Sequence, residues 1–69
     1  MKNFLVCFYA AEGIEPTNRV LVRQSASDGV IEKAKKHFVE QGVLQDDLSY
    51  FTTQDYGQAK IEGVDFVNS

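Results

Sequence analysis

The side chains in this sequence that could do chemistry are few and scattered. Acid–base or nucleophilic catalysis would need His37, the only histidine, or Cys7, the only cysteine. His37 stands beside Phe38 in a helical pattern, and the sequence marks no partner for general acid–base work. Cys7 lies within an apolar run, whereas reactive thiols need an accessible and electropositive setting. We therefore expect neither residue to be catalytic and the protein to be non-enzymatic.

The sequence also gives no indication of a metal or cofactor site. The acids Asp46, Asp47 and Asp55 match neither the ligand spacing of a calcium loop nor that of a Cys/His zinc site. There is no glycine-rich phosphate loop, no G-x-S-x-G and no H-E-x-x-H motif. We therefore predict no metal, no cofactor and no catalytic residue.

Length and composition narrow the class of protein. A chain of 69 residues is expected to form a single domain over residues 1–69, with little room for a deep cleft. Its contents of 43% hydrophobic and 25% charged residues are typical of a soluble globular protein. No apolar run approaches the roughly 20 residues of a membrane span, and one cysteine cannot form an internal disulfide. We expect a cytoplasmic protein that does not associate with membranes.

Acidic charge is concentrated in the last third of the chain. Residues 1–42 carry six lysines and arginines against five acids, whereas residues 43–69 carry one lysine against five acids. The stretch 44–58, LQDDLSYFTTQDYGQ, contains aromatic residues among acids. Protein–protein interfaces commonly combine buried aromatic side chains at the centre with a polar or charged rim. Strand alternation and ordinary solvated turns would account for part of this pattern. We predict that a protein partner binds here, through Asp46, Asp47, Tyr50, Asp55 and Tyr56.

Nucleic-acid binding is the alternative function. Two arginines share one face of a predicted strand and lysines follow on the helix, so the candidate phosphate-binding residues are Arg19, Arg23, Lys33 and Lys36. Phosphate-binding domains usually carry a strong basic excess, but the isoelectric point here is about 4.9. The reverse alternative, an acidic mimic of nucleic acid, would use the acids of the last third, although a mimic needs a longer regular row of charge. Both alternatives rank below protein binding.

The hydrophobic pattern predicts the elements that position these residues. Residues 4–10 (FLVCFYA) form a short, wholly apolar run, which suits a central strand buried on both faces. Residues 12–18 contain the only proline and predict a hairpin loop. Residues 18–24 alternate as a half-buried strand, with Val20 and Val22 on one face and Leu21 between two arginines on the other.

A helix is predicted next, followed by two further strands. Residues 25–28 resemble a capping box before an apolar stripe at helical spacing, formed by Val30, Ile31, Ala34 and Phe38. Gly42 supplies a C-terminal stop. Residues 48–53 predict a third strand, 54–58 a turn, and 59–62 a fourth strand. Residues 64–67 either extend the fourth strand beyond a bend at Gly63 or form a separate short strand.

The order of these elements predicts an α+β fold. We expect two layers, with one helix packed on one face of an antiparallel four-stranded sheet of order 2-1-3-4. One helix covers only part of such a sheet, so Leu5, Cys7, Tyr9 and Leu21 are expected on a partly open second face. An open apolar face on a small protein predicts a homodimer or a docked partner.

The layout of the chain resembles small proteins of phages and mobile elements. The features are an N-terminal MK-x-F-x-V, then S-x-S-D-x-x-I-E-K-A-K on the helix, and an acidic β-rich tail. Some small anti-CRISPR proteins have a similar organisation of strands and helix. The resemblance implies a non-enzymatic inhibitor or accessory factor that binds a protein, and it carries over no individual residue.

Overall fold

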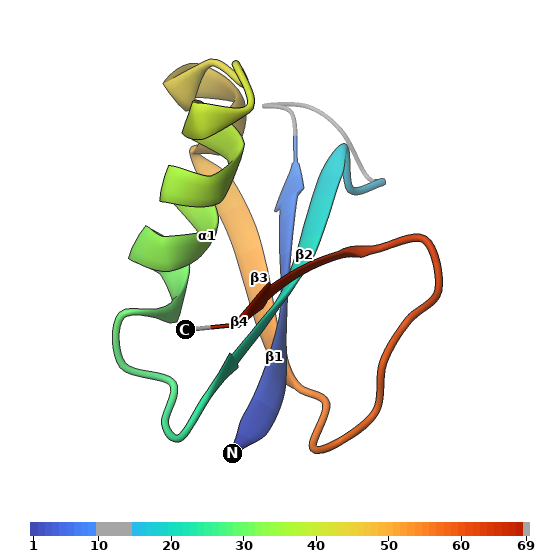
Figure 1. Cartoon of the computed structure of the whole chain (residues 1–69). Helices are drawn as coiled ribbons and strands as arrows, with labels where there is room; N and C mark the ends of the chain where they lie inside the picture. The colour runs from blue at the N-terminus through green and yellow to red at the C-terminus, as the bar shows by residue number, and fades with distance from the viewer. Residues whose placement is uncertain (10–14, 69) are drawn as a thin grey trace.

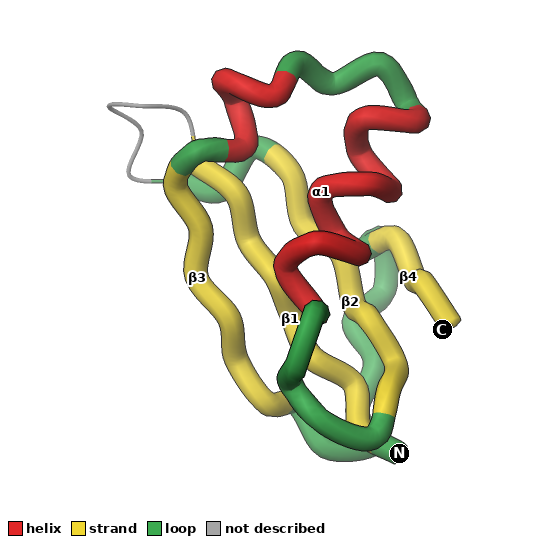
Figure 2. The backbone as a smooth tube through the Cα atoms, turned by 90° about the vertical axis from the view of Figure 1, so that its left-hand side faces the viewer, coloured by secondary structure: helices red, strands yellow, loops and turns green. Residues whose placement is uncertain are grey.

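The computed structural model describes residues 1–9 and 15–68. It contains one four-stranded sheet with a single helix against one face, so the fold is α+β as predicted (Figures 1 and 2). The elements in chain order are β1 (Lys2–Tyr9), β2 (Asn18–Gln24), α1 (Val30–Glu40), the short 3-10 helix η1 (Gln45–Leu48), β3 (Tyr50–Asp55) and β4 (Asp65–Asn68). Ala10 and part of the predicted hairpin loop lie outside the described residues.

β1 is the central strand, as its apolar sequence predicts. It pairs antiparallel with β2 on one side and with β3 on the other. Phe4, Val6 and Phe8 face the helix and are buried, while Leu5 and Cys7 are buried on the opposite face. The predicted faces of β2 are also confirmed, because Val20 and Val22 join the helix-side core.

α1 buries the predicted stripe through Val30, Ala34 and Phe38. The helix ends at Gly42 as expected, because this residue adopts φ 92°. The N–H of Gly42 donates to the carbonyl of Val39, and the N–H of Val43 donates to the carbonyl of Phe38. The predicted capping box is wrong. The N-cap is Gly29 at φ 75°, with no side-chain cap.

The preceding turn is instead held by the buried side chain of Gln24. Its Nε2 donates to the carbonyls of Ala26 and Asp28, and its Oε1 accepts a 2.8 Å hydrogen bond from Lys33 Nζ. This amide therefore joins the end of β2 to the start of the helix.

The predicted strand order is wrong for β4. The sheet runs β3-β1-β2-β4, and β4 pairs parallel with β2, so the sheet is mixed and not antiparallel. The chain does not turn back beside β3. Residues 56–64 cross the second face of the sheet and deliver β4 to the far edge, the orange-to-red path at the right of Figure 1.

The crossing segment covers the face that was expected to be open. Leu5, Cys7 and Leu21 are buried there at 7%, 8% and 1% exposure, and Tyr56, Ile61 and Val64 pack on them together with Tyr9. The premise of a homodimer through an uncovered sheet face is therefore wrong. The physical reason is that the chain uses its own apolar tail residues to cover this face.

Two strand boundaries also differ from the prediction. Residues 48–53 were expected as the third strand, but Gln45–Leu48 form η1 and β3 begins at Tyr50. Residues 59–62 do not form a strand, because this part of the chain packs through Ile61 against the sheet face. β4 is the separate short strand that was the second expectation for 64–67, and Gly63 at φ 82° precedes it.

Among the described residues, no helix has the length and apolar character to cross a membrane.

Candidate protein-binding edge

The five predicted partner-binding residues do not form one surface. Asp46 and Asp47 lie in η1 beside Tyr50, at the start of β3. Asp55 and Tyr56 lie at its other end, about 17 Å away at the usual rise per residue of a strand. The acidic aromatic hairpin expected from the sequence does not exist, because β3 and β4 occupy opposite edges of the sheet.

Asp55 and Tyr56 have structural roles. Asp55 Oδ2 lies 3.1 Å from Lys2 Nζ, and Oδ1 accepts a 2.8 Å hydrogen bond from the N–H of Gly57, which shapes the turn. Both bonds lower the pKa of the Asp55 carboxyl, and the hydrogen bond from the Gly57 N–H has a larger effect than the one from Lys2. Tyr56, which was predicted to bind a partner from the turn 54–58, is instead half-buried against Leu5, Cys7 and their neighbours.

The exposed residues that remain together belong to β3 itself. All six of its residues, YFTTQD, are exposed, with Tyr50 at 56% and Phe51 at 44%. Figure 2 shows β3 along one side of the sheet, while α1 packs over β1 and β2. No strand of the described residues pairs with the outer edge of β3.

The backbone groups at this outer edge can be assigned. The N–H of Tyr56 bonds to the carbonyl of Asn3 in β1, at 2.8 Å. Since the N–H and C=O of successive strand residues point to alternate sides, those of Phe51, Thr53 and Asp55 point away from β1. An extended segment placed beside β3 would meet donors and acceptors at these three positions.

Most of this edge lacks the features that usually prevent pairing. Charged side chains (lysine above all), proline and bulges commonly guard edge strands, and residues 50–54 contain no charged residue and no proline, so Asp55 at the end of β3 is its one charged residue. Tyrosine, phenylalanine and threonine also favour extended structure. The other edge strand, β4, is only four residues long, and short strands make poor templates. β3 is therefore the edge better suited to accept another strand.

Phe51 forms part of this edge on the helix side of the sheet. Its ring lies 6.2 Å from that of Phe8, directly across the ladder, and Lys35 Nζ lies 5.5 Å from its centroid. The Phe51 ring can therefore make an apolar contact with a partner while the Lys35 ammonium beside it supplies positive charge. Sequence reasoning left Phe51 and Thr53 out of the candidate site. The uncharged, β-prone run 50–54 was the signal that could have included them.

The alternative nucleic-acid residues are divided between two sides of the sheet. Lys33 and Lys36 lie on α1, whereas Arg19 and Arg23 share the opposite face with Leu21. Arg23 is half-buried, with Nη1 3.5 Å from Asn3 Oδ1 and 3.3 Å from Gln58 Oε1. These four residues therefore do not combine into one phosphate-binding surface.

His37 lies where α1 meets β4. Its Nε2 is 3.0 Å from Asp65 Oδ2, and Gln41 Nε2 lies 3.4 Å from the same oxygen. The bond from His37, with that from Gln41, lowers the pKa of the Asp65 carboxyl. The pair fixes β4 to the last turn of the helix.

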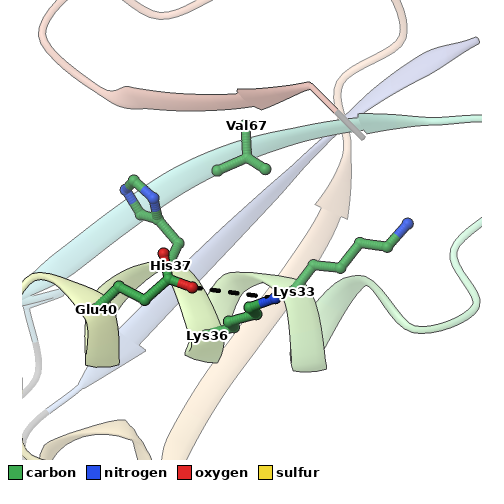
Figure 3. A pocket seen from close by; sticks show the side chains of 5 residues that line it. All are labelled: Lys33, Lys36, His37, Glu40 and Val67. Atoms are coloured by element: carbon green, nitrogen blue, oxygen red, sulfur yellow. Dashed lines mark ion pairs between the residues drawn. The ribbon is translucent and has the colours of Figure 1, made fainter.

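A hollow of about 290 Å³ lies next to this pair (Figure 3). Lys33, Lys36, His37, Glu40 and Val67 line it, with Lys36 Nζ 4.0 Å from Glu40 Oε1. None of these lining residues is a serine, threonine or cysteine, so none of them offers a hydroxyl or thiol that the histidine–carboxylate pair could activate. Among the described residues, no group of three or more His, Cys, Asp or Glu side chains is placed to hold a metal ion.

Comparison with protein-family models, with curated protein sequences and with solved structures finds no match for this chain.

Proposed function

We propose that this chain is a small, non-enzymatic protein-binding module that accepts an extended segment of a partner along the outer edge of β3. The observation that carries the proposal is an edge strand with all six residues exposed, whose outward backbone groups belong to Phe51, Thr53 and Asp55. Strand addition of this kind gains affinity from main-chain hydrogen bonds and specificity from alternate side chains.

The side chains beside the edge define the chemistry of a suitable partner. Tyr50 and Phe51 offer aromatic surface on opposite faces of the strand, and Asp46 and Asp47 add negative charge near its start. An extended segment with apolar residues and a basic end would match this arrangement. An inhibitor or accessory factor of this kind would act by occupying the segment, without any chemical step.

The direct test compares two substitutions at one position. Thr53→Pro removes the outward N–H and leaves the β1 ladder intact, since proline is tolerated on a strand edge. Thr53→Val keeps the N–H and the branched shape. Peptides selected from a displayed random library on wild-type protein should bind Thr53→Val normally and Thr53→Pro at least about tenfold more weakly, as expected for one lost hydrogen bond and a blocked edge.

Circular dichroism and thermal unfolding would establish that both variants fold. Equal binding of the selected peptides to the proline variant would contradict the proposal. Binding of labelled oligonucleotides that weakens steeply with salt would support the nucleic-acid alternative instead.

A further inference from the structure

We propose that a second copy of this chain occupies the β3 edge when no partner is bound, with the two β3 strands antiparallel and centred on Thr53. The inference rests on the proposed function, because it concerns the same edge, and it names a regulator of that edge. Self-pairing would cover the binding site and make it available only on dissociation.

The register follows from the backbone. In a symmetric antiparallel pair, one residue must face its own counterpart across the two-fold axis. Centring on Thr53 sets Phe51 opposite Asp55 of the second copy, and the outward N–H and C=O groups of both strands then form about six main-chain hydrogen bonds.

Other symmetric registers are less favourable. Centring on Asp55 would set two carboxylates against each other, which destabilises a strand pair. Centring on Phe51 would pair fewer residues, because η1 and Ser49 lie just before the start of β3. Centring on Thr52 would set Asp55 against Ser49, and centring on Gln54 would set Phe51 against Gly57; both partners lie outside the strand, so only about four of the six hydrogen bonds would form within it.

Charge complementarity supports the Thr53 register. Lys35 Nζ lies 5.5 Å from the centroid of the Phe51 ring. The residue that would face this ring from the second copy is Asp55, which also binds Lys2 of its own chain and keeps about half of its side chain exposed. A second ammonium group would therefore approach this carboxylate at each end of the pair. Residues 50–54 are uncharged, and the central contacts therefore place no like charges together.

The shape of the molecule permits this pairing. Both helices would lie on one face of a continuous sheet, and α1 sits over β1 and β2, away from the β3 edge (Figure 2). The surface area that a six-residue strand edge can bury is small compared with the roughly 800 Å² per partner of a standard interface. We expect a weak dimer that forms as concentration rises.

A charge swap at Thr53 tests the register. Thr53→Lys and Thr53→Asp each place like charges face to face at the two-fold axis, so each variant alone should dimerise at least about fivefold more weakly than wild type. An equal mixture of the two variants should recover dimerisation as a mixed pair. Sedimentation velocity from the micromolar to the millimolar range measures the wild type, the two variants and their mixture.

Thr52→Lys is the matched control, because Thr52 would face Gln54 of the second copy and not itself. Its dimerisation should stay close to that of wild type. A wild-type protein that remains monomeric at millimolar concentration would overturn self-pairing, as would a Thr53→Lys variant that dimerises like wild type. Peptide binding by a strictly monomeric wild type would still uphold the proposed function, so the two failures are distinguishable.

Discussion

At the residue scale, Asn3 is the polar group that holds the crossing segment against the sheet. Its side chain is fully buried at 0% exposure, and its Nδ2 donates a 2.7 Å hydrogen bond to the carbonyl of Ala59. Its backbone also bonds to Tyr56 and Gly57, at 2.8 and 2.7 Å. One side chain thus joins the start of β1 to the segment that covers the second face.

Removal of this side chain should lower stability. Asn3→Ala deletes the hydrogen bond to Ala59 and the contact with Arg23, so the free energy of unfolding should fall by about 1–3 kcal/mol. Urea unfolding followed by circular dichroism measures the change. The control is Gln45→Ala, an exposed position in η1, where we expect a change within about 0.5 kcal/mol. Equal stability of the two variants would contradict the role of Asn3.

At the element scale, β4 depends on contacts with α1 as well as on its pairing with β2. Val67 packs against the helix-side core, and Asp65 bonds to His37 in the last turn of the helix. The hydrogen bond from His37 holds the pKa of Asp65 below its ordinary value of 3.8. A depressed carboxylate pKa contributes stability at neutral pH, and this contribution is lost as pH falls through the folded-state pKa.

Asp65→Asn should therefore reduce stability at neutral pH, by less than about 1 kcal/mol because the carboxylate is half exposed and screened by solvent. The difference between wild type and variant should shrink as pH falls below 3.8. Unfolding measured at several pH values gives this curve, with Asp46→Asn as a control of equal charge change. A difference that keeps growing as the pH falls below 3.8 would contradict the assignment.

The sequence predicted the elements better than their arrangement. β2 and α1 were recognisable because their periodicity depends only on which face is buried, and β1 because a short, wholly apolar run is typical of a strand buried on both faces. The position of β4 could not be recognised in this way. Ile61 and Val64 have too few apolar neighbours in the sequence to show a period, and their burial depends on the distant residues Leu5 and Leu21.

The candidate site was only partly predictable for the same reason. Aromatics and acids in 44–58 were recognised, and Tyr50 is indeed exposed. The role of Asp55 in the turn and the burial of Tyr56 depend on Lys2 and on the sheet face, which are distant in sequence. The open edge depends on strand order, and the incorrect order 2-1-3-4 placed β3 in the interior of the sheet.

At the scale of the whole molecule, the fold covers both faces of β1 and β2 and leaves β3 as the long exposed edge among the described residues. α1 covers these two strands on one face and residues 56–64 cover them on the other. With its central strands covered, the sheet is most readily extended at an edge. Both proposals, for a partner segment and for a second copy, depend on this edge being open in the free molecule.

Amide hydrogen exchange, resolved by residue in dilute protein, tests that claim most directly. Alternation predicts fast exchange for the outward amides of Phe51, Thr53 and Asp55, and protection for those of Thr52 and Gln54, which face β1. Addition of a selected peptide, or concentration of the protein, should then protect the outward three. Protection of all five amides in dilute, monomeric protein would mean that the edge is already covered, and would contradict the account.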